Sequence, residues 1–308
     1  MPKFELKNIT GVMPALVTPF DENEKFDEKR MRGIINFLID RGVDGFYITG
    51  STGEAFLMSP EERKRVLEVV VDETAGRLPV IAHIGAIGTH TSVDLAEHAQ
   101  ENGVDALSSV PPFYWPFTSN MIQNYYTDLT KSTDLPMIIY NIPLVGLMGF
   151  EQIMNLSSIK GVGGIKYTAP TQFDFLRIKE EIGPDFMVYS GTDEMAMSGL
   201  MYGADGLIGS FYNMIPEVII ELCKAVKEND MSKAKHLQEV VNKIIFFGIA
   251  NKGVSFIKRA MAWQGADAGY CRKPFDNFTS NEEAELKEKC RQLMQNHKLE
   301  GVAFLDAI

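Results

Sequence analysis

Residues 42–51 read GVDGFYITGS, a turn motif that runs directly into an apolar stretch. The motif returns as GVDA at 103–106 and as GADG at 203–206, each time after a helical pattern and before an apolar stretch. In each copy the glycine can end the helix in the left-handed conformation, and the aspartate can bond the backbone of the turn. Three copies of the same helix-to-strand turn predict a repeating β/α unit.

Eight short apolar stretches follow this rhythm along the chain. Their apolar content is nearly continuous rather than alternating, as strands buried on both faces of a parallel sheet require. We predict an α/β protein, a (β/α)8 TIM barrel with a C-terminal helical appendage. A doubly wound sheet is the alternative, because one sequence does not reveal the order of the strands. The stretches are 11–20, 42–51, 78–86, 106–112, 136–143, 161–168, 186–191 and 206–213.

Helical patterns fill the intervals and continue beyond the eighth stretch. Residues 216–227 are expected to form the last barrel helix, and 231–247 and 282–296 also have helical patterns. No segment rich in proline, glycine or serine separates them from the barrel. We therefore predict a catalytic barrel over 1–230 and a helical extension over 231–308 that packs on it.

Composition limits the classes of partner. The 308 residues are 45% hydrophobic and 23% charged, which excludes a disordered polymer and leaves ample material for a core. The 41 acidic against 30 basic residues give a net charge of −11. Such a chain neutralises few phosphates, so we expect no nucleic-acid partner. Any anionic substrate must be held by local donors rather than by a basic surface.

Cysteine usage and hydropathy indicate the compartment. Cys223, Cys271 and Cys290 are odd in number and far apart in the sequence, which suggests reduced thiols and a cytoplasmic protein. No apolar run approaches the ~18 residues of a membrane span, so we expect no membrane partner. The spacing of the histidines and cysteines fits no metal motif, and we expect no metal.

Lys166 is an unusual residue for its position, at the carboxyl end of the apolar stretch 161–168. The active sites of (β/α)8 barrels lie at the carboxyl ends of the strands. A lysine inside a buried strand must lose its charge or find a partner, and an amine with a lowered pKa can form imines with carbonyl compounds. The alternative is a lysine at a strand end with its ammonium group in solvent.

Tyr140 ends the apolar stretch before that of Lys166, within PMIIYNIP (136–143). A phenol at the barrel mouth can relay protons, or it can simply pack inside the barrel. The turn GSTGE (50–54) follows the second stretch, and its amides and hydroxyls can hold a carboxylate without a basic residue. Taken alone, this turn is weak evidence, because glycine-rich turns are common in α/β folds.

Acidic residues follow the seventh stretch, in Gly191-Thr192-Asp193-Glu194. Asp193 and Glu194 can bind polyol hydroxyls, act as acid and base, or ligate a metal. They also suit the first turn of a helix, where carboxylates interact favourably with the helix dipole. The two roles are compatible.

Together these motifs resemble the pyruvate-dependent class I aldolase family that includes N-acetylneuraminate lyases and dihydrodipicolinate synthases. The resemblance runs from about residue 10 to residue 215, through GSTGEAF (50–56), YNIP (140–143), GIKYT (164–168), GTDE (191–194) and GS (209–210). It implies an enzyme, a carbon–carbon lyase with a (β/α)8 barrel that needs no cofactor beyond a covalent Schiff base on its own lysine.

The resemblance also implies roles for individual residues. Lys166 would be the Schiff-base lysine and Tyr140 the proton relay, and Ser51 and Thr52 would bind the pyruvate carboxylate. Tyr114 matches the tyrosine that a neighbouring subunit contributes to the relay, which implies a homotetramer. Further substrate contacts are carried over to Thr168, Gly191, Asp193, Glu194 and Ser210.

Within the family the motifs are closer to the lyases, which cleave N-acetylneuraminate to N-acetylmannosamine and pyruvate. PFYWPF (112–117) and CRKPF (271–275) stand nearly as they do in lyases. Synthases carry an arginine five residues after the catalytic tyrosine, and here that position is Val145. The alternatives are another pyruvate aldolase, such as a 2-keto-3-deoxy-gluconate aldolase, a synthase, and a non-catalytic barrel that binds sugar acids. The segments 144–149 and 251–256 depart from the lyase pattern.

Overall fold

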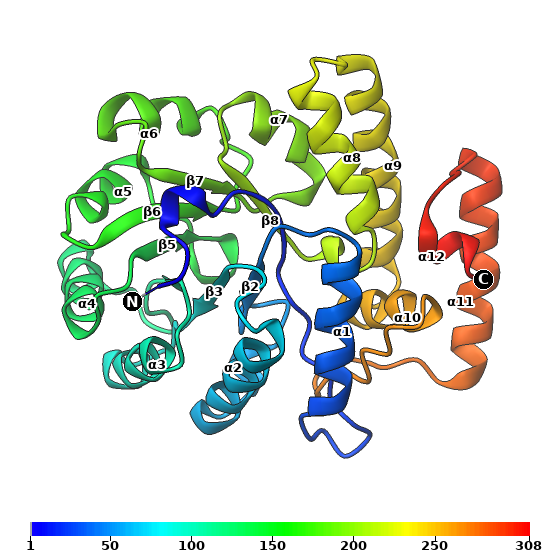
Figure 1. Cartoon of the computed structure of the whole chain (residues 1–308), viewed down its shortest axis with the longest axis horizontal. Coiled ribbons are helices and arrows are strands. Elements are labelled where there is room, and N and C mark those ends of the chain that lie inside the picture. The colour runs from blue at the N-terminus through cyan, green and yellow to red at the C-terminus, as the bar shows by residue number, and fades with distance from the viewer. Residues whose placement is uncertain (1) are drawn as a thin grey trace.

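The computed structural model describes residues 2–308 and confirms a (β/α)8 barrel with additional helices at the C-terminal end (Figure 1). Neighbouring strands in space are neighbours in sequence, in the order β1-β8-β7-β6-β5-β4-β3-β2, and all these pairs are parallel. A parallel bridge between Ala15 and Tyr47 joins the strand ends of β1 and β2 and completes the ring. This circular order rules out the doubly wound sheet. The strands are β1 (Gly11–Pro14), β2 (Phe46–Ile48), β3 (Val80–His83), β4 (Ala106–Ser109), β5 (Met137–Asn141), β6 (Val162–Tyr167), β7 (Met187–Ser190) and β8 (Gly206–Gly209).

The helices surround this ring and then continue past it. The helix α2 starts as a capping box, in which the Ser59 side chain accepts from the Glu62 amide and the Glu62 carboxylate accepts from the Ser59 amide. Pro60 takes its first position, where a missing N–H costs nothing. The helices are α1 (Glu28–Asp40), α2 (Pro60–Thr74), α3 (Thr89–Glu101), α4 (Ser119–Ser132), α5 (Phe150–Ser157), α6 (Asp174–Ile182), α7 (Ala196–Met201), α8 (Pro216–Lys227), α9 (Met231–Ala250), α10 (Val254–Trp263), α11 (Ser280–His297) and α12 (Ala303–Asp306).

The repeated turn works differently from the sequence prediction in one respect. Its glycines, Gly42, Gly103 and Gly203, all have φ between 79° and 87°, as predicted for helix ends. The aspartates, however, bond the preceding strand rather than their own turn. Asp44 accepts from the Val12 amide of β1 at 2.7 Å, Asp105 from the Val80 amide of β3 at 2.9 Å and Asp205 from the Val188 amide of β7 at 2.7 Å. The motif therefore ties adjacent strands together at the amino end of the barrel.

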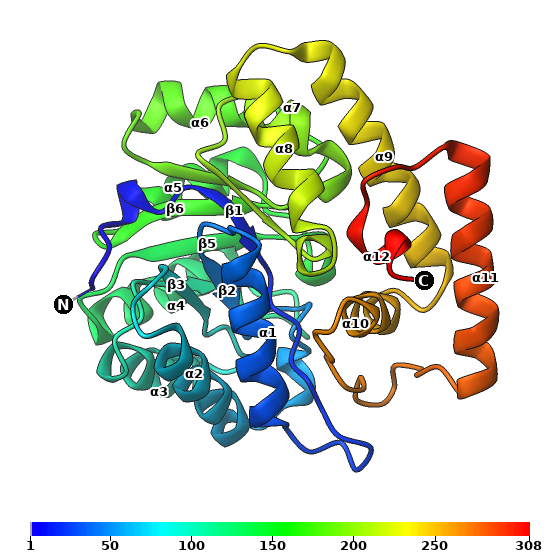
Figure 2. The same ribbon diagram turned by 45° about the vertical axis from the view of Figure 1, so that its right-hand side comes forward.

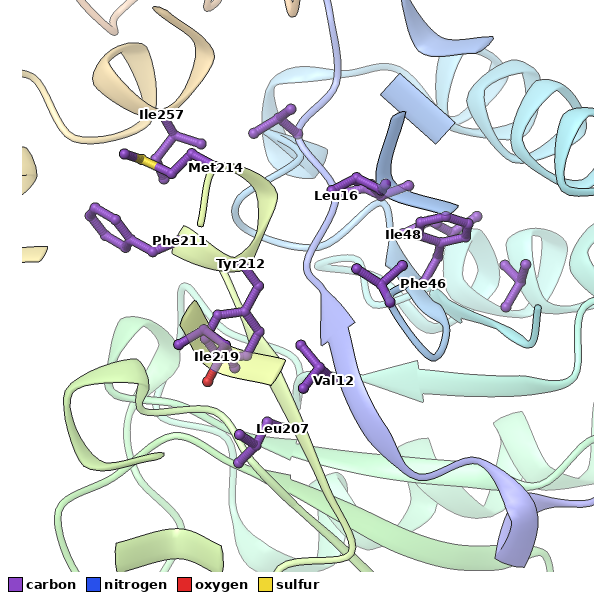
Figure 3. Close-up of a cluster of buried hydrophobic side chains, with 14 of the residues drawn as sticks. Val12, Leu16, Phe46, Ile48, Leu207, Phe211, Tyr212, Met214, Ile219 and Ile257 are labelled. Carbon is purple, nitrogen blue, oxygen red and sulfur yellow. The ribbon is translucent and has the colours of Figure 1, made fainter. Parts of the chain in front are cut away.

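Two apolar cores result from strands that are buried on both faces. One fills the barrel itself with inward-facing side chains such as Met13, Tyr47 and Ile138, and Phe4, Leu6 and Ile9 close its amino end. The other lies between the strands and the surrounding helices, and part of it appears in Figure 3. Because the amino end is closed, a ligand has access at the carboxyl ends of the strands.

Among the C-terminal helices, α9 packs against α8, α11 lies outermost, and α12 lies between α9 and α11 (Figure 2). The helix α10, for which the sequence analysis made no prediction, places Ile257 in the same buried cluster as Phe211 and Met214 of the barrel (Figure 3). We keep the boundary at residue 230 as a proposal, since α8 ends at Lys227 and α9 begins at Met231. No single helix in residues 2–308 is long and apolar enough to cross a membrane, although α9 and α10, bent by 116°, meet the criterion as a pair.

Candidate active site

Lys166 and Tyr140 lie side by side at the carboxyl ends of β6 and β5, where they are partners in the strand register. The alternation of side chains along a strand turns both of them into the barrel. Lys166 is only 3% exposed, so the alternative with its ammonium group in solvent is wrong. The Nζ atom of Lys166 lies 4.2 Å from the centroid of the Tyr140 ring. The two residues that the sequence proposed for imine chemistry are thus in contact.

The amine of Lys166 has an electrostatic setting suited to a nucleophile. Burial lowers its pKa from 10.5 to about 7, and the negative charge of Asp193 partly opposes that fall. A lysine with a pKa of about 7 is largely uncharged at slightly alkaline pH, and the uncharged amine is the form that attacks a carbonyl carbon. The lysine is therefore activated by desolvation rather than by a hydrogen-bonded base.

The phenol of Tyr140 is also buried, which raises its pKa above the ordinary value of 10; the side chains of Ser51 and Thr168 oppose the rise. Tyr140 consequently keeps its proton at neutral pH. It is suited to pass protons between a substrate and neighbouring hydroxyls, rather than to act as a permanent phenolate. Its ring also packs edge-on against those of Tyr47 and His83.

The turn at residues 50–54 presents donors next to this pair. The Glu54 amide donates to the Ser51 carbonyl, and the Ala55 amide donates to the Gly50 carbonyl. The amides of Ser51 and Thr52, by contrast, donate to no acceptor among the described residues. Thr52 Oγ1 lies 2.7 Å from Ser210 Oγ, so the turn after β2 and the end of β8 meet across the mouth. Free amides and hydroxyls at one point form a site that can hold a carboxylate.

Asp193 is a buried residue at the mouth of the barrel. Its Oδ2 accepts from the Phe211 amide at 3.0 Å, and burial raises its pKa to about 7. Asp193 and Glu194 also lie in the first turn of a helix, as the sequence suggested: they begin the 3-10 helix Asp193–Met195, which leads directly into α7 at Ala196. Thr192, which precedes this turn, makes no side-chain capping bond. Glu194 is half-buried beside it, and its charge contributes to the raised pKa of Asp193.

Unpaired polar atoms gather at this mouth. In residues 2–308, twelve buried side-chain atoms have no hydrogen-bond partner of good geometry, and five of them belong to residues at this mouth: Ser51 Oγ, Thr168 Oγ1, Thr192 Oγ1, Asp193 Oδ1 and the Tyr212 hydroxyl. Buried polar groups in native proteins are nearly always paired, so such a cluster points to a polar ligand.

Two positions at the mouth require glycine, because neighbouring side chains lie too close to leave room for a Cβ atom. A Cβ atom on Gly191 would lie 2.0 Å from Thr168 Oγ1 and 3.2 Å from Lys166 Cε. A Cβ atom on Gly209 would lie 2.1 Å from Asp193 Oδ1. A side chain at either position would collide with the groups that line the mouth, which explains why the sequence has glycine there.

Tyr114 is the predicted site residue that this chain does not bring to Lys166. Its side chain is 73% exposed and packs edge-on against Phe117. Val145, which stands where synthases have an arginine, packs against the apolar cluster inside the barrel and supplies no positive charge. This position therefore has no cationic side chain that could bind a second carboxylate of a substrate.

Sequence reasoning missed two groups at the site. One is Tyr47 on β2, whose ring centroid lies 4.0 Å from Lys166 Nζ. The period-two alternation of the strand could have indicated that it faces inward. The other is the buried ion pair between Glu54 and Lys258, with a separation of 2.6 Å. No local signal on α10 marks Lys258, since its partner is about 200 residues away in sequence.

His83 is a hydrogen-bonded residue of the barrel interior. Its Nδ1 lies 2.9 Å from the Thr49 carbonyl oxygen, and burial keeps its pKa well below 6.5. Residues 2–308 contain no group of three or more histidine, cysteine, aspartate or glutamate side chains arranged to hold a metal ion.

Comparisons with known proteins agree with this geometry. Residues 8–293 match the model of the dihydrodipicolinate synthetase family. An N-acetylneuraminate lyase from Citrobacter koseri is 41% identical over 293 residues, which cover 94% of this chain and 98% of the relative.

Solved structures show the same fold. The protein CdNal from Clostridium difficile, determined in complex with mannosamine, has a TM-score of 0.88 at 32% identity and covers 94% of this chain and 99% of its own. A dihydrodipicolinate synthase from Bacillus anthracis has a TM-score of 0.86 at 29% identity, with 93% and 98% covered. Both branches of the family are therefore represented among the structural relatives.

Proposed function

This chain belongs to the dihydrodipicolinate synthetase family, and on that premise we propose that it is a class I aldolase that reversibly cleaves N-acetylneuraminate to N-acetylmannosamine and pyruvate. One observation carries the proposal: a buried lysine with a pKa of about 7 touches a tyrosine, beside a turn with free amides. The similarity over 94% of the chain to a lyase supports this substrate.

The proposed reaction begins with attack of the uncharged Lys166 amine on the C2 ketone of the open-chain sugar acid. Tyr140 moves protons as the carbinolamine loses water, which leaves a protonated imine on Lys166. The C3–C4 bond then breaks, and its electron pair flows into the imine to give an enamine. Tyr140 takes up the proton of the C4 hydroxyl as it passes its own proton to the substrate carboxylate, and N-acetylmannosamine leaves.

The second half of the reaction restores the enzyme. Protonation of the enamine at C3 regenerates an imine, and the water molecule lost earlier is returned in its hydrolysis to pyruvate and free Lys166. The imine supplies the electron sink, so this chemistry requires no metal or separate cofactor. We assign the pyruvate carboxylate to Ser51 and Thr52, and the sugar hydroxyls to Thr168, Gly191, Asp193, Glu194 and Ser210.

Substrate choice is the first point to test. Pyruvate release can be followed with a coupled lactate dehydrogenase assay, with N-acetylneuraminate and 2-keto-3-deoxygluconate offered separately. We expect release from N-acetylneuraminate at the higher kcat/KM. Release from 2-keto-3-deoxygluconate alone would assign the chain to a sister aldolase, and condensation of pyruvate with an amino-acid semialdehyde would assign it to the synthases.

The covalent step is tested separately from the substrate. Borohydride reduction in the presence of pyruvate should trap a stable adduct, and peptide mass mapping should place it on Lys166. Lys166→Met provides the control, because methionine has similar length and no amine. An adduct on another lysine, or none at all, would contradict the imine mechanism.

We also propose that the active unit is a homotetramer in which Tyr114 of one copy completes the proton relay of another. Its exposed ring supports this, as does an apolar cavity of about 230 Å³ beside Ser51 that Phe56, Leu144 and Phe275 line. We place the protein in the cytoplasm, in keeping with three buried and unpaired cysteines in the described chain.

Mixed oligomers test the shared site. Lys166→Met lacks the nucleophile, and Tyr114→Phe lacks the relayed hydroxyl. When the two variants are dissociated and reassembled together, some sites receive Lys166 from one copy and Tyr114 from the other. Activity should rise above the average of the separate variants; an average value would indicate that each copy works alone.

A further inference from the structure

The protonated imine carries a positive charge, and none of the side chains assigned so far is placed to stabilise it. When the Lys166 amine attacks a ketone, the carbonyl oxygen leaves as water after taking up protons. The nitrogen then holds a double bond to carbon, one hydrogen and a positive charge. That charge forms in the barrel interior, where an unpaired ion is costly. This inference rests on the imine chemistry of the proposed function.

The nearby carboxylate is poorly placed to meet this demand alone. Asp193 acts on Lys166 through its charge, but no hydrogen bond or ion pair joins the Lys166 amine to another group in residues 2–308. One oxygen of Asp193 is already engaged by the Phe211 amide. Because its pKa is about 7, the carboxyl group is neutral for part of the time at neutral pH.

Two aromatic rings, by contrast, contact the amine directly. Lys166 Nζ lies 4.0 Å from the ring centroid of Tyr47 and 4.2 Å from that of Tyr140. The two rings stand nearly perpendicular, with centroids 5.9 Å apart and planes at 80°. Both distances lie within the range of about 6 Å in which a cation is attracted to an aromatic face, and the attraction grows when water is excluded.

Tyr47 is held in this place by the surrounding backbone and side chains. Its hydroxyl donates to Ser108 Oγ on β4 at 3.1 Å. On the other side, a Cβ atom on Gly50 would lie 2.6 Å from Tyr47 Cε1, so the start of the carboxylate-binding turn packs against the ring. The ring therefore has a fixed position between that turn and the lysine.

The hydroxyl of Tyr47 is unsuited to proton relay, in contrast to that of Tyr140. The ring is fully buried, and burial raises the pKa of the hydroxyl well above 10. A group that is held by Ser108 and keeps its proton does not exchange protons with a substrate at the lysine. The function of Tyr47 at the site must lie in its ring.

We propose that the Tyr47 ring stabilises the protonated imine on Lys166 through a cation–π interaction. It favours the charged intermediate over the uncharged amine and positions the nitrogen between two ring faces. Unlike a carboxylate, the ring does not repel the carboxylate of the substrate.

A pair of variants separates the ring from its hydroxyl. Tyr47→Phe keeps the ring and loses the bond to Ser108, whereas Tyr47→Leu removes the ring. At subsaturating pyruvate, borohydride should trap about 10- to 30-fold less adduct in Tyr47→Leu than in the wild type, the range expected for a desolvated cation–π contact. Tyr47→Phe should trap nearly as much as the wild type. Equal trapping in all three proteins would overturn the proposal.

The pH profile distinguishes this effect from simple loosening of the site. The ring favours the charged lysine, so its removal lowers the pKa of Lys166 further. The acid limb of kcat/KM should therefore move to lower pH in Tyr47→Leu. Loosening that admits water would instead raise the pKa towards 10.5 and move the limb to higher pH. A shift in that direction would show a structural role only.

Fluorination keeps the test decisive if Tyr47→Leu folds poorly. Phenylalanine with one, two or three fluorine atoms at position 47 retains the shape of the ring while progressively weakening the negative potential of its face. The trapped fraction should fall stepwise with fluorine content, and a flat series would overturn the proposal. If the wild type itself gives no adduct on Lys166, the proposed function fails instead, so the two failures are distinguishable.

Discussion

Lys166 and Lys258 are buried to almost the same extent, with 3% and 1% of their surface exposed, yet their amines have different neighbours. Lys258 on α10 donates to the Glu54 carboxylate at 2.6 Å and to the carbonyls of Thr18 and Tyr270 at 2.7 and 2.6 Å. Lys166 faces two aromatic rings. The three donor hydrogens of Lys258 are thus satisfied by three acceptors, whereas the Lys166 amine is left available to a ligand.

The difference shows how burial can either create reactivity or remove it. A buried amine without acceptors is biased towards its uncharged, nucleophilic form. A buried ammonium group with a carboxylate and two carbonyls is compensated and unreactive. Lys258 instead has a structural effect, because it holds the side chain of Glu54. Glu54 ends the carboxylate-binding turn with a left-handed φ of 60°. Its other oxygen accepts from the Arg272 amide at 2.7 Å, so the pair ties the C-terminal segment to the active site.

The largest effect is expected from Lys166→Met. Loss of the nucleophile should reduce kcat by a factor on the order of 10⁴–10⁶. The same change should raise the free energy of unfolding by about 1–3 kcal/mol at pH 7, because it removes an amine whose desolvation is only partly offset by Asp193 and the two rings. Coupled pyruvate assays and chemical denaturation measure the two quantities.

The pH dependence gives the sign of that stabilisation. The folded-state pKa of Lys166 is lowered from 10.5 to about 7. Its cost to stability is therefore complete below pH 7 and disappears as the pH rises towards 10.5. The stability advantage of Lys166→Met should shrink over the same interval. A variant less stable than the wild type at pH 7 would contradict the view that the desolvation of this lysine outweighs its favourable contacts.

The same substitution at the other lysine should have the opposite effect on stability. Lys258→Met leaves the Glu54 carboxylate buried without its cation, which should lower the free energy of unfolding by about 3–5 kcal/mol. Because Glu54 shapes the turn that carries Ser51 and Thr52, we also expect a higher KM in the protein that remains folded. Denaturation curves and steady-state kinetics provide both readouts.

A double variant isolates the charge of that pair. Glu54→Gln combined with Lys258→Met removes both charges, so it should be more stable than Lys258→Met alone by at least about 1 kcal/mol. If the two substitutions are simply additive, the contact between these side chains does not account for the role of Lys258.

The contrast between the two lysines also explains what the sequence could reveal. Lys166 stands out because it interrupts an apolar strand, and the order of the strands and turns predicts which end of the barrel it occupies. Lys258 lies in VSFIKRAMAW (254–263), where a lysine is an ordinary helix residue. Its burial depends on Glu54 and Thr18, which the chain brings to it only through tertiary folding.

Tyr47 was missed for a related reason. Strand alternation indicates that its side chain points inward, but not which of the inward side chains meet at one level of the barrel. That depends on the register between strands and on the closure of the ring, which local sequence does not encode. The position of Tyr114 relative to a second copy is likewise beyond what one chain's sequence pattern specifies.

The smallest effect is expected where the same buried network reaches the surface. The Arg272 guanidinium pairs with Glu62 and also donates to the carbonyls of Glu24 and Leu57. The Glu62 side chain is 35% exposed, so solvent screens this pair. Glu62→Gln keeps the side chain that closes the capping box of α2 and removes only the charge. It should lower the free energy of unfolding by no more than about 1 kcal/mol at pH 7.

The bond to Arg272 lowers the pKa of Glu62 below 4.5. Its contribution is therefore present above pH 4.5 and lost as the pH falls through the folded-state value, so the variant and the wild type should converge in acid. If Glu62→Gln lowered the free energy of unfolding at pH 7 as much as Lys258→Met, burial would not explain the difference between the Glu62–Arg272 and Glu54–Lys258 pairs.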